Sequence, residues 1–194
     1  MDKLIPVVVI KDVNETEKTL SALRAGGINC AEITFRTTCA EEAIKLAVKL
    51  FPDMNIGAGT VINEEQAIRA INAGAKFIVS PGLSEKVALY VRQQGVPYYP
   101  GCVTPTEIMQ ALELGITTVK IFPANVYGGL KALKALSGPF PQVKFIPTGG
   151  VDLSNLKEFL EFDKIFAVGG SFMVKGDITE NCKKACKIIK EVKL

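Results

Sequence analysis

Eight short apolar runs, each followed by an amphipathic stretch, constrain the fold of this chain more than any other feature of its 194 residues. The units repeat at roughly twenty residues, and neighbouring parallel strands need a helical crossover of this kind. Eight strands close a (β/α)8 barrel, whereas an open doubly wound sheet usually has fewer. We therefore predict an α/β protein in which residues 1–194 form one (β/α)8 TIM barrel domain.

The predicted strands are short apolar runs, and they cover residues 5–10, 30–35, 55–59, 77–80, 97–100, 117–122, 144–147 and 165–168. The predicted helices lie between and after them, at residues 13–25, 40–50, 64–73, 84–94, 105–114, 129–136, 153–162 and 179–192. Thr104 followed by Pro105 predicts a helix start, with the threonine as N-cap. Several helices end at a glycine that tolerates the left-handed C-cap conformation: Gly26, Gly74, Gly95 and Gly115.

The absence of histidine excludes several kinds of chemistry. Ser-His and Cys-His nucleophiles, histidine zinc sites and histidine acid–base catalysis all require this residue. Five cysteines without a repeating spacing argue against a disulfide framework, and nothing near Cys182 and Cys186 completes a metal site. Proton transfer must therefore use carboxylate, lysine, tyrosine, cysteine or water.

Charge and hydropathy narrow the choice of partners and compartment. The net charge of +3 is mild, and a solvated face explains the lysines of the last helix, so we expect no nucleic-acid partner. The apolar run that begins at Leu4 is too short to span a bilayer, and no cleavage site of small residues follows it. We expect a cytoplasmic protein with no membrane partner.

Lys120 lies inside an apolar, β-branched strand, with Thr118 and Phe122 on its own face. Burial disfavours the charged ammonium, so a lysine here is costly. The cost makes sense if the amine works in its neutral form, as a nucleophile that forms a Schiff base with a carbonyl. The structural alternative is a lysine on an exposed edge strand.

The second predicted strand aligns a carboxylate and a guanidinium on one face. With a period of two, Glu32, Thr34 and Arg36 point one way, while Ile33 and Phe35 point toward the helices. In the functional interpretation, Glu32 transfers protons and Arg36 binds a substrate carboxylate, which its planar fork matches. In the structural interpretation, the two form an ion pair inside the barrel.

Glycine-rich segments follow several strands at the end of a barrel where function is found. Gly57-Ala58-Gly59-Thr60 allows close backbone approach and offers a hydroxyl, and Ser80-Pro81-Gly82 ends the next strand similarly. Thr148-Gly149-Gly150 and Gly169-Gly170-Ser171 follow the seventh and eighth strands, where barrels commonly hold phosphate on backbone N–H groups. We therefore expect a phosphate site rather than simple turns at these two ends.

Taken together, these motifs make the chain resemble the bacterial 2-keto-3-deoxy-6-phosphogluconate (KDPG) aldolases, also called 4-hydroxy-2-oxoglutarate (KHG) aldolases. The matching motifs run in the family's order across nearly the whole chain: Glu32-Ile33-Thr34-Phe35-Arg36-Thr37, Gly57-Ala58-Gly59-Thr60-Val61, Val79-Ser80-Pro81-Gly82, Pro100-Gly101, Lys120-Ile121-Phe122-Pro123-Ala124, Gly128-Gly129, Gly138-Pro139-Phe140, Pro147-Thr148-Gly149-Gly150 and Gly169-Gly170-Ser171. Two positions depart from the family's pattern: Phe172 stands where many members have Trp, and Asn125 where many have Glu.

The resemblance implies a class I aldolase on a (β/α)8 barrel, without metal or cofactor and typically a homotrimer. It places the Schiff-base lysine on Lys120 and the catalytic glutamate on Glu32. The other site residues that we predict are Arg36, Thr60, Pro81, Phe122 and Thr148 for the substrate, and Gly149, Gly150, Gly170 and Ser171 for its phosphate.

The hypothesis is that Lys120 attacks the C2 ketone of KDPG, and that pyruvate and glyceraldehyde 3-phosphate leave. The partners are then a 2-keto acid and a phosphorylated aldehyde. One alternative is a sister pyruvate aldolase, acting on the galactonate analogue or only on KHG. Another is a phosphate-barrel isomerase or epimerase in which Lys120 gives electrostatic support, and a third is a non-catalytic binding protein on the same fold.

Overall fold

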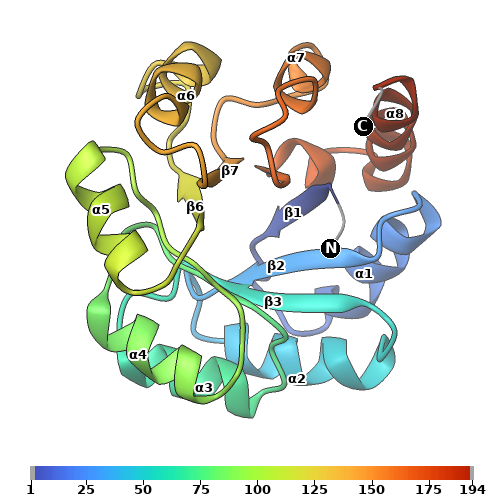
Figure 1. Ribbon diagram of the computed structural model, residues 1–194. Coiled ribbons are helices and arrows are strands. Elements are labelled where there is room, and N and C mark those ends of the chain that lie inside the picture. Colours follow the sequence, from blue (N-terminus) through green and yellow to red (C-terminus); the bar gives the residue numbers. More distant parts are fainter. Residues whose placement is uncertain (1–2, 193–194) are drawn as a thin grey trace.

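A computed structural model describes residues 3–192 of the chain (Figure 1). The strands are β1 (Leu4–Val8), β2 (Cys30–Thr34), β3 (Asn55–Gly59), β4 (Ile78–Val79), β5 (Tyr98–Tyr99), β6 (Thr118–Ile121), β7 (Lys144–Pro147) and β8 (Val168–Gly170). The helices are α1 (Glu15–Ala25), α2 (Ala40–Leu50), α3 (Glu64–Asn72), α4 (Glu85–Gln93), α5 (Pro105–Glu113), α6 (Gly129–Ser137), α7 (Leu156–Leu160), the short 3₁₀ helix η1 (Phe172–Val174) and α8 (Ile178–Glu191).

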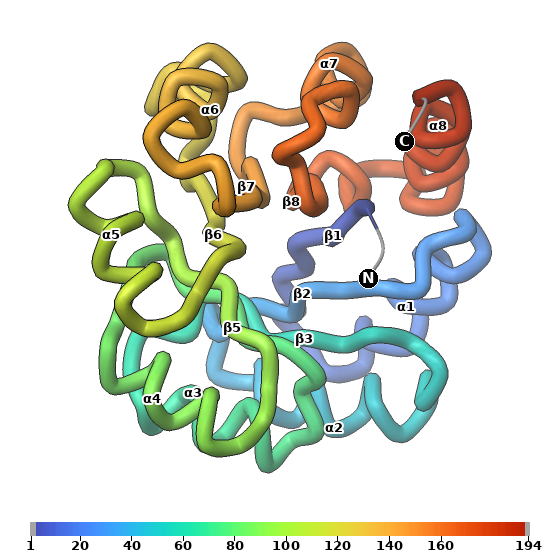
Figure 2. The backbone as a smooth tube through the Cα atoms, in the orientation of Figure 1, coloured from blue at the N-terminus to red at the C-terminus, as the bar shows by residue number. Residues whose placement is uncertain are grey.

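The strands close into a ring of parallel pairs. Six of them are hydrogen-bonded in the order β5-β4-β3-β2-β1-β8, and β6 pairs with β7. A bridge between Gly101 and Lys120 joins the β5 side to β6, and bridges from Phe145 to Ile165 and from Thr148 to Gly169 join β7 to the β8 side. The helices surround this ring (Figures 1 and 2). The predicted (β/α)8 barrel is therefore confirmed, although the boundary residues 1–2 and 193–194 of the predicted domain lie outside the described part.

Most predicted elements begin and end within two residues of those in the structure, and two elements, α7 and β8, begin three residues later than predicted. Helix α7 begins at Leu156 rather than at residue 153, because the Asp152 carboxylate accepts hydrogen bonds from the backbone and hydroxyl of Ser154 and holds a turn there. Strand β8 is shifted toward its glycines: Gly169 and Gly170 pair with β1, whereas Ile165 makes only an isolated bridge. The shift brings the glycine pair into the sheet itself.

Three of the four predicted glycine C-caps adopt the left-handed conformation, namely Gly74, Gly95 and Gly115. The prediction for Gly26 is wrong, because its φ is −81° and the left-handed residue is Gly27, with a φ of 89°. Gly26 is required for another reason: a Cβ there would lie 2.3 Å from the Cβ of Cys182 on α8. At α5 the predicted start is confirmed, and Thr104 and Glu107 complete a capping box.

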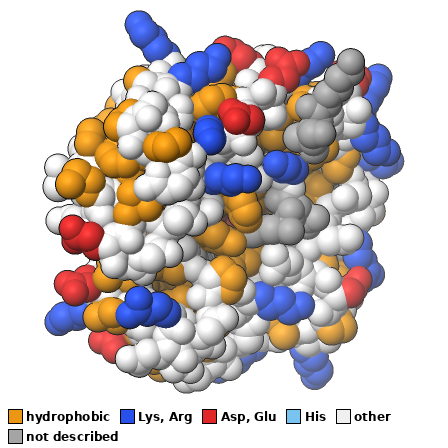
Figure 3. Space-filling model, viewed as in Figure 1, with side chains coloured by type: hydrophobic (Ala, Val, Ile, Leu, Met, Phe, Trp, Pro, Cys, Tyr) orange, Lys and Arg blue, Asp and Glu red, His pale blue; other side chains and the backbone are white. Residues whose placement is uncertain are grey.

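The apolar core lies between the ring and the helices, and aromatic rings fill part of the ring's interior. The Tyr99 ring lies 6.1 Å from that of Phe77 and 5.8 Å from that of Phe166, between centroids. Because β5 and β8 are not neighbours in the ring, the second contact crosses the interior. Lys and Arg side chains are scattered over the face in Figure 3 and lie among Asp and Glu. Within residues 3–192, no helix is long and apolar enough to cross a membrane.

The close approach of α1 and α8 generates a stability prediction. We expect Gly26→Ala to lower the free energy of unfolding by about 1–3 kcal/mol, because the new methyl group overlaps Cys182. Gly138 is the matched control: it also has a right-handed backbone at a helix end, but its Cβ would meet only the Ala135 carbonyl oxygen, at 3.4 Å. Urea unfolding of both variants checks this, and equal stability of the two would contradict it.

Candidate active site

Lys120 and Glu32 form a buried ion pair across the centre of the barrel. In the ring, three strands separate β2 from β6 on either side, so the two side chains approach each other from opposite walls. The Lys120 Nζ lies 3.2 Å from Glu32 Oε1, and the two residues are 3% and 2% exposed. A pair this deep is held in place by its mutual attraction, because neither charge has water as an alternative partner.

The edge-strand alternative for Lys120 does not hold in this barrel. Its backbone N–H donates to the Pro100 carbonyl at 2.8 Å, and its carbonyl accepts from Cys102 at 2.9 Å, while β7 pairs with the other side of the strand. The lysine is therefore enclosed by neighbouring strands on both sides. Cys102 itself does not compete as a nucleophile, because burial raises the pKa of its thiol to about 12.

The residues around Lys120 and Glu32 leave space for the Glu32 carboxylate, and the Phe122 ring lies beside the Lys120 amine. Gly59 is required beside Glu32, because a Cβ there would lie within 3 Å of the carboxylate. The Phe122 ring centroid lies 5.5 Å from the Lys120 Nζ. Thr34 is fully buried on the same face of β2 as Glu32, and its hydroxyl has no hydrogen-bond partner among the described residues. Thr34 is not among the site residues predicted from the sequence.

Arg36 and Thr60 meet at the carboxyl ends of β2 and β3. The Arg36 Nε donates to the Thr60 hydroxyl at 3.1 Å, and the guanidinium stays exposed. Thr60 has a φ of 55°, a left-handed conformation that is unfavourable for a β-branched residue. Strain of this kind costs about 1–3 kcal/mol and concentrates at functional sites. Its position at a strand end, with its hydroxyl on a guanidinium, makes this pair a candidate ligand-binding element.

A cavity of about 240 Å³ opens between the ends of β6, β7 and β8. Its lining includes most of the predicted substrate and phosphate residues: Arg36, Phe122, Thr148, Gly149, Gly150, Gly170 and Ser171. Pro81 is exposed after β4 and does not line this cavity. The structure thus gathers the Arg36 end and the glycine pairs around one space and leaves Pro81 apart from it.

The loop after β7 is held so that its amides are available to an anion. The Gly149 carbonyl accepts from the Asn125 backbone at 3.2 Å, and the Gly150 carbonyl accepts from the Asn155 side chain at 2.9 Å. Both glycines have positive φ, and a Cβ on Gly150 would overlap Asn125. Within residues 3–192, the N–H groups of Gly149, Gly150 and Ser171 donate to no protein acceptor. Unpaired amides around a cavity are suited to phosphate oxygens.

Sequence reasoning missed two charged residues that line this cavity, Asp152 and Lys175. Both follow a glycine pair at close distance in the sequence, and this is the signal that could have found them. Asn155 was also missed, although its side chain holds the Gly150 carbonyl.

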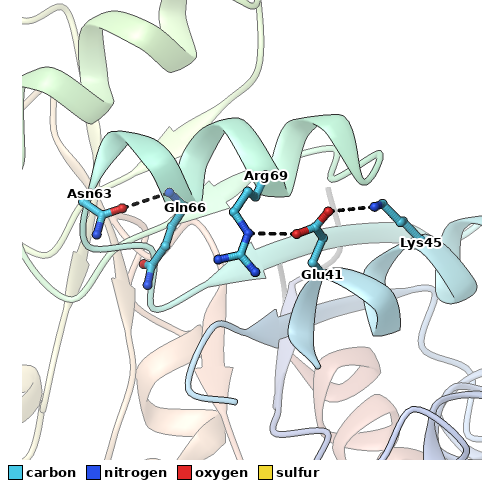
Figure 4. A network of polar contacts seen from close by, with 5 residues as sticks. All are labelled: Glu41, Lys45, Asn63, Gln66 and Arg69. Atoms are coloured by element: carbon cyan, nitrogen blue, oxygen red, sulfur yellow. Dashed lines mark hydrogen bonds and ion pairs between the residues drawn. The ribbon is translucent and has the colours of Figure 1, made fainter. Parts of the chain in front are cut away.

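A second ion-pair cluster lies on the outside of the barrel and serves as a contrast (Figure 4). Glu41 on α2 accepts from Lys45 at 2.7 Å and from Arg69 on α3 at 2.8 Å, and these hydrogen bonds hold the pKa of Glu41 below its ordinary value. Asn63 caps α3 by accepting from the Gln66 backbone at 2.9 Å. All five side chains are exposed or partly exposed, so the cluster links two helices at the surface of the barrel.

The comparisons with known proteins agree on one family. The model of the KDPG and KHG aldolase family matches residues 1–190. The chain is similar to the 2-dehydro-3-deoxy-phosphogluconate aldolase of Treponema pallidum, with 45% identity over 172 residues, which are 89% of this chain and 82% of the relative.

Two solved structures are similar over nearly their whole length. The KDPG aldolase of Zymomonas mobilis ZM4 with 3-phosphoglycerate has a TM-score of 0.90 and 40% identity, covering 94% of this chain and 90% of that one. The KDPG aldolase of Legionella pneumophila, with pyruvate captured at low pH as a covalent carbinolamine intermediate, has a TM-score of 0.88 and 39% identity, covering 98% and 93%.

The buried pair generates a stability prediction that is independent of any activity. We expect Lys120→Met and Glu32→Gln each to destabilise the protein by about 3–5 kcal/mol, because each leaves one buried charge without its partner. The double variant should lose clearly less than the sum of the two, as measured by urea unfolding.

The control is the surface pair Glu41 and Lys45, of which Glu41 is only partly exposed; Glu41→Gln and Lys45→Met should couple by less than about 1 kcal/mol. Additive losses for the Lys120 and Glu32 variants would contradict a tightly coupled pair.

Proposed function

The chain belongs to the KDPG and KHG aldolase family, and from this premise we propose that it cleaves KDPG to pyruvate and glyceraldehyde 3-phosphate through a Schiff base on Lys120. As an aldolase it is a carbon–carbon lyase. We also propose that it cleaves KHG, which has the same 4-hydroxy-2-keto acid group, to pyruvate and glyoxylate. The observation that carries the proposal is the Lys120 amine, enclosed in the barrel 3.2 Å from a carboxylate.

The first step is attack of the amine on the C2 ketone of the substrate. Lys120 passes a proton to Glu32, and its free electron pair then forms the C–N bond, which gives a carbinolamine. Glu32 returns a proton to the departing hydroxyl, water leaves, and an iminium remains. A carbinolamine of pyruvate was captured in the Legionella pneumophila aldolase, which supports this sequence.

The iminium is the electron sink for breaking the C3–C4 bond. Glu32 takes the proton of the C4 hydroxyl, directly or through one water, and the electrons of the C3–C4 bond move into the iminium to form an enamine. The aldehyde leaves, C3 is protonated, and water hydrolyses the resulting iminium to release pyruvate and restore Lys120. Glu32 therefore acts as both base and acid, a role for which this histidine-free chain has a carboxylate already in contact with the nucleophile.

The two ends of the substrate are assigned to the two ends of the site. The Arg36 guanidinium and the Thr60 hydroxyl bind the C1 carboxylate, with Thr148 nearby, and Phe122 packs beside the reacting carbons. The backbone amides of Gly149, Gly150 and Ser171, next to Gly170, bind the phosphate. The 3-phosphoglycerate in the Zymomonas mobilis aldolase structure supports a phosphorylated ligand in this family. Pro81 stays a predicted substrate residue, apart from this cavity.

Family membership argues against the isomerase and the non-catalytic binding protein, because the matching family and its relatives are aldolases and neither alternative would use Lys120 as a nucleophile. The galactonate analogue differs from KDPG in stereochemistry and is the substrate to compare. One domain, a homotrimeric assembly and a cytoplasmic location remain predictions.

Trapping the Schiff base tests the proposal. We expect borohydride reduction in the presence of pyruvate to leave an adduct on Lys120, found by peptide mass spectrometry, because reduction fixes the iminium as a stable amine. Lys120→Arg, checked for folding by circular dichroism, should form no adduct and lose roughly 10³-fold or more in kcat.

Lys131 and Lys134 on α6 are internal controls, since both are exposed. An adduct on either lysine would assign the nucleophile to that residue instead of Lys120. If the folded protein formed no adduct at all, the aldolase mechanism would be overturned.

A further inference from the structure

Lys175 contributes a positive charge to the part of the cavity that the glycine loops surround. Among the residues lining that cavity, the cations are Arg36 and Lys175, and the acid is Asp152. A phosphate ester carries a charge of about −1.5 to −2 at neutral pH. Backbone amides supply only partial positive charges. Neutralising the phosphate therefore depends on which of the two cations faces it.

Arg36 belongs to the other end of the substrate. Its Nε is already held by the Thr60 hydroxyl at 3.1 Å, at the carboxyl end of β3. In the proposed reaction the carboxylate on C1 and the phosphate on C6 lie at opposite ends of a six-carbon chain. One guanidinium cannot pair with both groups in a fixed orientation, so Arg36 leaves the phosphate without a cation of its own.

Asp152 adds a negative charge to the cavity, so the lack of positive charge beside the phosphate becomes more severe. Its carboxylate accepts from the Ser154 hydroxyl at 2.5 Å and from the Ser154 backbone at 2.8 Å, and these bonds hold the pKa of Asp152 below its ordinary value. The carboxylate therefore stays charged at neutral pH and repels a phosphate at the same cavity. With Arg36 committed, Lys175 is the lining residue that can offset both negative charges.

The backbone of Lys175 is fixed while its ammonium is left free. The Asn181 side chain on α8 donates to the Lys175 carbonyl at 2.6 Å and to the Phe172 carbonyl at 3.4 Å, so it ties both ends of η1 to α8. The Lys175 ammonium forms no ion pair within residues 3–192. A cation that is anchored at its backbone and has no protein partner is available to a ligand in the cavity.

We infer that Lys175 binds the phosphate group of the substrate and makes the enzyme prefer phosphorylated over non-phosphorylated 4-hydroxy-2-keto acids. The inference rests on the proposed function and deepens it by naming a specificity residue of the same site. Lys175 touches no reacting carbon in this scheme. Lys175 contributes to binding at the phosphate end of the substrate. This contribution should be absent for a substrate that ends in a carboxylate instead of a phosphate ester.

The test compares two substrates in three variants. For Lys175→Met we expect kcat/KM for KDPG to fall roughly 10- to 100-fold, mainly through KM, as for a lost hydrogen bond between charged groups. For KHG the same variant should stay within about threefold of the unchanged enzyme. Lys175→Arg should recover most of the loss, and Lys86→Met, an exposed lysine on α4, should behave like the unchanged enzyme on both substrates.

Inhibition of KDPG cleavage by 3-phosphoglycerate is a second readout, and the inhibition constant should rise by a similar factor in Lys175→Met. Equal losses on KDPG and KHG, or no loss on either, would overturn the inference. In the latter case Lys175 belongs instead to the neighbouring cavity of about 610 Å³ beside α1, which it also lines with Glu15 and Asp177. Absence of aldolase activity in the unchanged enzyme would overturn the proposed function itself, so the two failures are distinguishable.

Discussion

The ion pair between Lys120 and Glu32 is the constraint on which the rest of this barrel depends. Two charges 3.2 Å apart with almost no solvent contact are tolerable only if the surrounding strands hold both in place. The ring does so by placing β2 and β6 on opposite walls, and Gly59 leaves the space that the carboxylate occupies. In the proposed mechanism, the same arrangement places the proton acceptor, Glu32, in contact with the nucleophile, Lys120.

The residues around this pair offer two groups of donors that suit anions. On one side the strained Thr60 carries a hydroxyl to Arg36, which suits a planar carboxylate. On the other, the loop after β7 lines a cavity; Asn125 and Asn155 hold its carbonyls, and within residues 3–192 the Gly149 and Gly150 amides donate to no protein acceptor. A 2-keto acid that carries a phosphate at its other end matches both, whereas KHG matches the first end fully and the second only in part.

Much of the fold was predictable, because the alternation of apolar runs and amphipathic stretches is a local property of the chain. Two errors come from side-chain contacts that the alternation of apolar and polar residues does not report. Gly26 looked like a left-handed C-cap, but contact with Cys182 on α8 is what requires glycine there. The start of α7 was placed too early, because the turn at Asp152 competes with the helix through side-chain hydrogen bonds.

The sequence by itself determined the parallel barrel, the family, and the candidates Lys120, Glu32 and the glycine pairs, because strand period and motif order can be read along the chain. Only the tertiary structure decided that the lysine and the glutamate touch, since 88 residues separate them and ring closure alone brings β2 opposite β6. It also decided which charges share the cavity. In the sequence, Lys175 is marked only by the glycine pair that precedes it, and the structure shows that it lines the same cavity as the loop after β7.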